Sequence, residues 1–137
     1  MKSESVQVPM PAQQFTQLLS ATPRGARLAR LLAVEQLVAW EWPRDSGPTR
    51  AAAHVVAELA LNAVRHGRVE GRGFRVTLVQ MPDTRLRGEV TDPRGERLPA
   101  RSVDGLGPAV VEAPAVDWGV RPYPPSGETV WAEVGSA

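Results

Sequence analysis

The stretch VVAELALNAVRHG, residues 55–67, contains three side chains that could do chemistry: Glu58, Asn62 and His66. Side chains four positions apart project from one face of an α-helix, with a drift of about 40° per step. A carboxylate there could accept a proton from a hydroxyl or a water, and a carboxamide oxygen suits a hard cation such as magnesium. The simpler alternative is an exposed polar stripe, with His66 near the carboxyl end of the helix, where a cation is favoured. The residue types alone leave both interpretations open.

Two helices are needed to position these side chains. The helix that carries them is predicted to begin at an N-cap, Asp45 or Ser46, and to end at His66, with Gly67 as its left-handed cap. Upstream, Ala26–Trp40 has the broad apolar stripe of an amphipathic helix and is followed by a proline. We therefore expect two consecutive helices in the first half of the chain.

Most of the predicted strands follow these helices. GFRVTLVQ (73–80) and LRGEVTD (86–92) flank a segment with turn residues, which predicts an antiparallel hairpin. A last strand is expected over 129–134, and residues 6–8 could form a short edge strand before the first helix.

Two elements are expected between the hairpin and the last strand: a polar loop over 93–104, and a short helix that begins after Gly107 and ends at Pro114. A proline-rich connector then leads to the last strand. The order is strand, helix, helix, strand, strand, loop, short helix, strand. It predicts an α+β fold: a two-layer sandwich with helices on one face of a mixed, mostly antiparallel sheet. With 137 residues, we expect a single domain over 1–137.

Composition excludes several classes of function. The chain has no cysteine, so disulfides, thiolate metal sites and cysteine nucleophiles are excluded. The formal net charge is +1, with both signs interspersed, so neither direct nucleic-acid binding nor a membrane surface is indicated. The only lysine is Lys2, so phosphate binding would rely on backbone amides or arginine. Without a signal-like or membrane-spanning apolar segment, a cytoplasmic location is expected.

Four segments in this order resemble the motifs of the GHKL (histidine kinase-like) ATPase fold. ELALNAVRHG is similar to the N box of that family, VTDPRG to its first glycine box, DGLGPAVVEAPAVDWG to its second, and GETVWAEV to its terminal box and last strand. Within the family, the resemblance is closest to the small stand-alone anti-sigma-factor serine-protein kinases of actinobacterial type, and it covers most of the chain. It implies the Bergerat-type ATP-binding fold, with ATP and Mg²⁺ as ligands.

The resemblance also assigns roles to three side chains. Asn62 matches the position that supplies an oxygen to Mg²⁺, which otherwise keeps waters and phosphate oxygens. Glu58, one turn earlier, matches the general base that accepts the proton of the attacking hydroxyl, although it could merely orient a water. Asp92 matches the carboxylate that accepts a hydrogen bond from the adenine amino group; an ordinary strand-end turn residue is the alternative.

The remaining matches concern the nucleotide's surroundings. Gly105 and Gly107 would let the backbone approach the phosphates. Thr129 matches the terminal-box hydroxyl that supports a water or phosphate near the base. Gly95 falls in the first glycine box, but it follows Asp92 by three residues where the fuller pattern has two. The loop beside adenine is therefore expected to be built differently.

Other departures remove positive charge and regular structure. Leu106 and Glu128 stand where similar proteins often carry basic residues, Pro108 removes an amide that could face a phosphate, and Pro114 shortens the following helix. We therefore predict weaker ATP binding than is usual in this family.

Two functions follow from these matches and departures. The first is an ATP-dependent kinase that transfers the γ-phosphoryl group to a serine of a partner protein. The alternative is a catalytically weak or inactive nucleotide-binding module that regulates by sequestering its partner. In both cases the resemblance implies protein partners, a sigma factor or an antagonist of the anti-anti-sigma type, and a role in transcription regulation. A homodimer is expected only because similar proteins pair.

Overall fold

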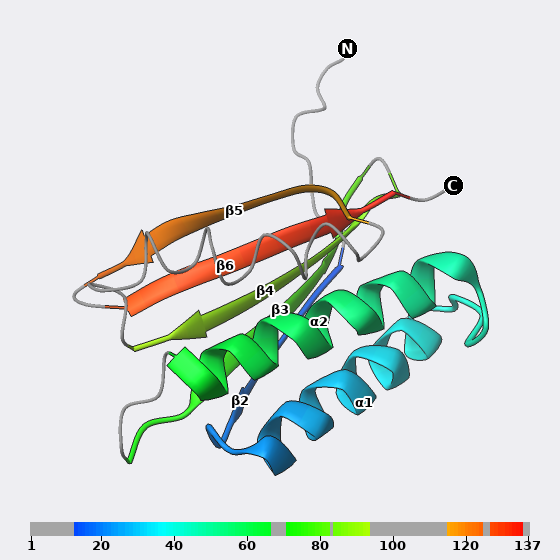
Figure 1. Cartoon of the computed structure of the whole chain (residues 1–137). Helices are drawn as coiled ribbons and strands as arrows, with labels where there is room; N and C mark the ends of the chain where they lie inside the picture. Colours follow the sequence, from blue (N-terminus) through cyan, green and yellow to red (C-terminus); the bar gives the residue numbers. More distant parts are fainter. Residues whose placement is uncertain (1–12, 67–70, 83, 94–114, 125–126, 136–137) are drawn as a thin grey trace.

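The computed structural model describes residues 13–66, 71–82, 84–93, 115–124 and 127–135 (Figure 1). In chain order, its elements are β2 (Gln13–Leu19), α1 (Pro23–Ala39), α2 (Gly47–His66), β3 (Phe74–Gln80), β4 (Leu86–Asp92), β5 (Ala115–Tyr123) and β6 (Gly127–Val134).

These strands form one sheet with the order β2-β3-β4-β6-β5, and each described pairing is antiparallel. Both helices lie against the same face of the sheet, with α2 over β4 and β6 (Figure 1). The predicted α+β sandwich with helices on one face is therefore confirmed. The opposite face, which we call the open face, is not covered by either helix.

Helix α1 begins at a strong local start signal. Thr22 is the N-cap, and its side-chain oxygen accepts a hydrogen bond from the Gly25 amide at 3.0 Å, while Pro23 occupies the first helical position. The helix therefore starts three residues before the predicted Ala26. Gly25 is required here because a Cβ at this position would lie only 1.9 Å from the Ser20 carbonyl oxygen.

Helix α2 begins where the sequence predicts. The Ser46 hydroxyl oxygen accepts a hydrogen bond from the Thr49 amide at 3.3 Å, as an N-cap does. The Thr49 hydroxyl in turn donates to the Pro43 carbonyl at 2.9 Å, and Thr49 is fully buried. These bonds fix the connection between the helices, and α2 continues to His66 as expected. The predicted cap, Gly67, lies outside the described residues.

The core lies between the helix layer and alternate residues of the sheet. The helix-facing strand residues are buried and mostly apolar: Phe74, Val76, Leu78, Leu86, Gly88, Val90, Val130, Ala132 and Val134. At Gly88 the two layers approach closely, since a Cβ there would lie 3.0 Å from a Val56 methyl group. This contact fixes α2 directly over β4.

Two edge strands were not predicted. β2 (QQFTQLL) has only Phe15 and Leu19 partly buried, so its apolar signal is weak. β5 contains Gly119 and Pro122, and its carboxyl-terminal part was interpreted as a proline-rich connector. An edge strand tolerates proline because one row of its amide groups has no partner in the sheet. The predicted strand at residues 6–8, and the loop and short helix within 94–114, lie outside the described residues.

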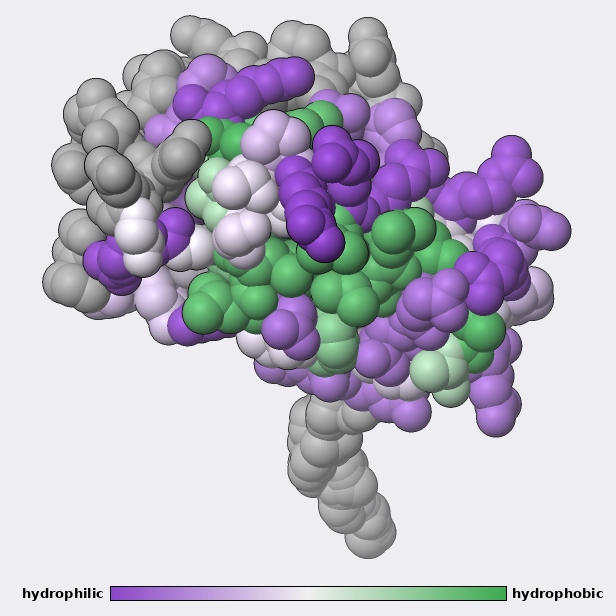
Figure 2. Space-filling view, turned by 90° about the horizontal axis from the view of Figure 1, so that it is seen from below, coloured by the Kyte–Doolittle hydropathy of each residue, from purple (hydrophilic) through white to green (hydrophobic). Residues whose placement is uncertain are grey.

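The outer surface of the helix layer carries an apolar patch bordered by hydrophilic residues (Figure 2). Leu28 and Leu31 of α1 are 40% and 59% exposed. Neither described helix has a stretch that is both long and apolar enough to cross a membrane.

Candidate functional site

The first two candidate residues lie one turn apart on α2. Asn62 is only 8% exposed, and Glu58 is partly buried. Within the part of the chain that the structure describes, neither side chain makes a hydrogen bond or an ion pair. A nearly buried carboxamide usually finds a partner inside the protein. Among the described residues, no group therefore competes with a ligand for the Asn62 amide.

The third candidate, Asp92, is the last residue of β4, and its side chain is 3% exposed. The carboxyl end of α2, the end of β4 and the start of β6 lie at the same end of the sandwich (Figure 1). Asp92 also belongs to the helix-facing set, because it alternates with Val90 and Gly88 along the strand. The fold therefore brings two parts together on one side of the sheet. They are the helix that carries Glu58 and Asn62, and the end of β4 that carries Asp92.

A fourth residue, the third acidic one, joins this end of the sheet. Glu128 of β6 is paired directly with Asp92 in the antiparallel register and is 2% exposed. Residues opposite each other in such a pair have Cβ atoms about 4.5–5.5 Å apart. The sequence interpretation treated Glu128 only as a loss of positive charge. Its position directly after Gly127 in the terminal box was the signal that could have identified it as a site residue.

Thr129 does not join the other candidates. It follows Glu128 on β6, so its side chain points to the open face, where its hydroxyl lies 2.7 Å from that of Thr91. Successive strand residues point to opposite faces, so a side chain next to a helix-facing residue must face away from the helices. The Thr129 hydroxyl therefore lies on the other face of the sheet from the Asp92 side chain, and its role near the base stays a prediction.

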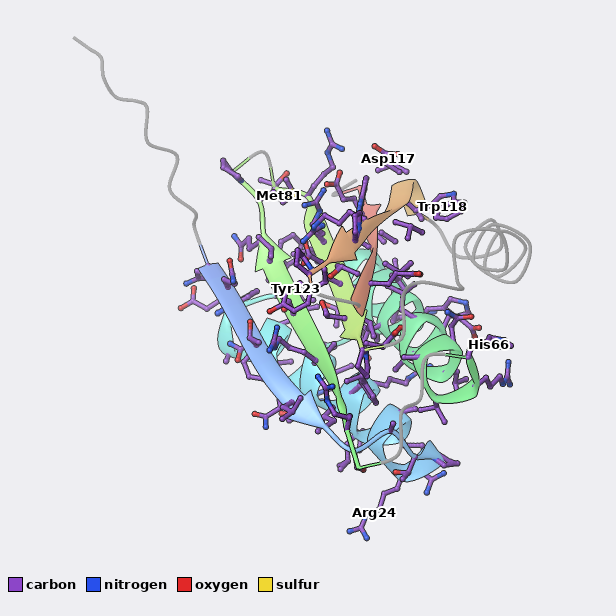
Figure 3. The ribbon with its side chains drawn as sticks, turned by 90° about the vertical axis from the view of Figure 1, so that its left-hand side faces the viewer. Arg24, His66, Met81, Asp117, Trp118 and Tyr123 are labelled. Atoms are coloured by element: carbon purple, nitrogen blue, oxygen red, sulfur yellow. The ribbon has the colours of Figure 1, made fainter. Side chains whose placement is uncertain are left out.

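The expected phosphate-binding residues cannot be placed. The glycines of both predicted glycine boxes, and the residues that depart from the family pattern near them, lie outside the described residues: Gly95, Gly105, Gly107, Leu106, Pro108 and Pro114. His66 is partly buried at the end of α2 (Figure 3), which agrees with its interpretation as a helix-end residue.

The arrangement has a limited capacity to bind metal by itself. Among the described residues, no group of three or more histidine or acidic side chains could hold a metal ion. A Mg²⁺ ion at Asn62 would therefore take most of its ligands from phosphate oxygens and water, as Mg²⁺ commonly does. The single carboxamide oxygen fits that chemistry.

The pKa shift that the structure does show lies away from this end of the molecule. Glu35 of α1 accepts a hydrogen bond from Arg44, which precedes α2, at 2.8 Å. This hydrogen bond and the charge of the guanidinium lower the pKa of Glu35, and the carboxylate raises that of Arg44. The pair connects the end of α1 to the segment before α2.

Comparison with known proteins adds to this geometry at the level of the fold. No family model matches the sequence, and no curated protein matches it. A solved structure of the RsbU and RsbW domains of Rv1364c from Mycobacterium tuberculosis matches with a TM-score of 0.66 and 24% sequence identity. The match covers 90% of this chain and 32% of that chain, so the protein spans about a third of its structural neighbour. The likeness establishes that the two share the two-layer α+β fold.

Proposed function

We propose that this chain is an ATP-binding regulatory protein of the anti-sigma-factor serine-kinase type, acting as one domain. The observation that carries the proposal is the nearly buried Asn62 carboxamide, which makes no hydrogen bond within the described residues and lies one turn from Glu58. The shared fold with a protein that contains RsbU and RsbW domains supports the same assignment.

The proposed roles use the polarity of each side chain. The Asn62 oxygen would bind Mg²⁺, which neutralises charge on the phosphates of ATP. The Asp92 carboxylate would accept a hydrogen bond from the adenine amino group. Because Asp92 is 3% exposed, water competes weakly for that bond.

Glu58 would act on the partner's serine. Its carboxylate would accept the hydroxyl proton while the serine oxygen forms a bond to the γ-phosphorus. The bond from that phosphorus to the β–γ bridging oxygen breaks, and ADP leaves with the electron pair. Glu58 is partly buried and has no competing ion pair among the described residues, so it is available for this proton.

A second function is favoured by one observation, the buried Glu128 opposite Asp92. A second carboxyl group beside the proposed adenine contact adds negative charge where a nucleotide polyanion must bind. On this alternative, the chain binds nucleotide weakly and regulates by sequestering a protein partner without transferring phosphate.

Phosphoryl transfer separates the two functions. A pull-down with the full chain followed by mass spectrometry would supply the partner. The purified pair would then be incubated with Mg²⁺ and ATP radiolabelled in its γ-phosphate, using the wild type and Glu58→Ala. The kinase proposal predicts label on a serine of the partner with the wild type, and a loss of at least about a hundredfold in rate with Glu58→Ala.

Exposed Glu41 provides the matched control, because Glu41→Ala removes a carboxylate outside both helices. It is expected to leave the rate unchanged. Partner binding without any transfer of label would contradict the kinase proposal and favour sequestration.

A further inference from the structure

The open face of the sheet carries arginines that are paired with acids. Arg85 and Arg87 contact Glu133 at 2.8 and 3.0 Å, and Arg87 also contacts Glu89 at 3.4 Å. Arg121 reaches the other oxygen of Glu89 at 3.1 Å. Each of these three guanidinium groups therefore contacts at least one of two carboxylates, Glu89 and Glu133, on the same face.

Arg75 on the same face is different. Its guanidinium donates a hydrogen bond to the Tyr123 hydroxyl at 2.9 Å and lies 5.4 Å from the centre of the Tyr123 ring. Both of these contacts are with an uncharged partner. Among the described residues, Arg75 has no carboxylate partner, although it is half-buried.

The Arg75–Tyr123 contact spans the sheet. Arg75 lies on β3 and Tyr123 on β5, and β4 and β6 run between them, a distance of about 14 Å at ordinary strand spacing. Two small side chains, Thr91 and Thr129, occupy the intervening strands beside Arg75. The long side chains therefore meet above a floor of threonines.

A pocket of about 360 Å³ lies at this end of the sheet. Its lining includes Arg75, Tyr123 and Thr91, exposed Arg72 just before β3, and Leu18 and Pro124. This volume is in the range of small-molecule sites. We call it the open-face pocket; Tyr123 marks its position in Figure 3.

Among the described lining residues of the open-face pocket, basic side chains outnumber acidic ones. Arg72, like Arg75, has no ion pair within the described residues. The single acid among the described lining residues is Asp92, whose side chain is 3% exposed and belongs to the helix-facing set. Two guanidinium groups therefore face the pocket, and the one carboxylate among its described lining residues is nearly buried.

The geometry points to a phosphate monoester carried on a small molecule as the ligand of the open-face pocket. Guanidinium groups bind phosphate oxygens through paired hydrogen bonds. The Tyr123 oxygen accepts a bond from Arg75, so its own proton remains available to donate. Two guanidinium groups and one hydroxyl match the three terminal oxygens of a monoester, and Leu18 and Pro124 can contact the organic part. Arg75, Tyr123 and Thr91 lie on the other face of the sheet from Asn62. The pocket also touches Asp92 at the strand end, but the inference does not depend on the proposed kinase function.

The test uses the full chain and phenyl phosphate, with inorganic phosphate and benzoate as comparison ligands. Binding would be followed by NMR through the amides of Thr91 and Gly127, which line the pocket, and of Asn62, which lies on the helix side. Saturable shifts of the pocket amides are expected, with phenyl phosphate binding more tightly than either comparison ligand.

Three variants assign the effect to named groups. Arg75→Gln is expected to weaken phenyl phosphate binding at least about tenfold, and Tyr123→Phe less, because the ring is retained. The control Arg30→Gln removes the same charge from the exposed surface of α1 and is expected to leave binding unchanged. If Arg75→Gln does not fold, exposed Arg72→Gln replaces it and must weaken binding.

Several results would overturn the proposal. The first is that the shifts of the pocket amides do not saturate, and the second is that Arg75→Gln, or its replacement Arg72→Gln, binds phenyl phosphate as tightly as the control variant does. The third is that benzoate binds as tightly as phenyl phosphate. The fourth is that the shifts are confined to the amides around Asn62. The last result would mean that phosphate enters the proposed nucleotide site instead.

Discussion

Asp92 and Glu128 lie directly opposite each other on β4 and β6, and their side chains are 3% and 2% exposed. Residues at opposed positions of an antiparallel pair lie close together, so two carboxyl groups are buried side by side at this end of the sheet. One of these carboxyl groups is the proposed adenine contact. A change at Glu128 is therefore expected to affect nucleotide binding at Asp92.

Glu128→Gln should strengthen nucleotide binding. We expect the affinity for Mg²⁺-ATP to rise several-fold, because an isosteric neutral group removes a negative charge beside the proposed adenine contact. The free energy of unfolding should change by less than about 1 kcal/mol, because the side chain keeps its size and its capacity for hydrogen bonds. Urea denaturation and isothermal titration would measure the two effects. Exposed Glu41→Gln is the matched control and should change neither quantity; a destabilised Glu128→Gln variant would show that the charge of Glu128 is needed in the fold.

Asn62→Ala should separate binding from stability. We expect Mg²⁺-ATP affinity to fall at least about tenfold, or about 1.4 kcal/mol, because an oxygen ligand is lost. The free energy of unfolding should change by less than about 1 kcal/mol, since the carboxamide makes no hydrogen bond within the described residues. Isothermal titration and thermal unfolding would be compared with Gln36→Ala, which removes a carboxamide from α1. Unchanged ATP affinity in Asn62→Ala would remove the main support for the nucleotide site.

Gly25→Ala should be strongly destabilising. Its new Cβ would lie 1.9 Å from the Ser20 carbonyl oxygen, so the backbone before α1 must move. We expect a loss of about 2 kcal/mol or more in the free energy of unfolding. Gly47, at the start of α2, has nothing within 4 Å of the corresponding position. Gly47→Ala should therefore leave stability unchanged or raise it by up to about 1 kcal/mol. Urea denaturation of the two variants gives the comparison, and equal effects would contradict the close contact at Gly25.

Arg44→Gln should alter how stability depends on pH. Arg44 lowers the pKa of Glu35, and a carboxyl group with a lowered folded pKa adds stability above its unfolded pKa. That contribution disappears as the pH falls through the folded pKa. Wild type should be slightly more stable than Arg44→Gln at about pH 7, and this small difference should decrease as the pH falls through the folded pKa. Urea denaturation over a range of acidic pH values, with NMR titration of Glu35, would check this. An unchanged Glu35 titration curve in the variant would rule out the coupling.

Local signals in the sequence were sufficient for the helices and the central hairpin. The start of α2 was predicted because a capping serine and a proline lie next to each other in the chain, and the start of α1 was missed by three residues because Thr22 and Pro23 were not used as the same kind of signal. The hairpin of β3 and β4 was predicted from its apolar runs and turn residues. The edge strands were missed because β2 is mostly polar and β5 contains Pro122, and such segments become strands through pairing with a neighbour.

The sequence by itself determined that Glu58 and Asn62 share one helix face, because the helical repeat is local. It also determined that Glu128 and Thr129 point to opposite faces, because strand side chains alternate. Only the tertiary structure decided which of the two faces the helices. The packing of α2 over Gly88 and the Asp92–Glu128 register buried Glu128 beside Asp92 and left Thr129 on the open face. Contact between layers is a non-local property, and strand alternation alone is equally compatible with either face.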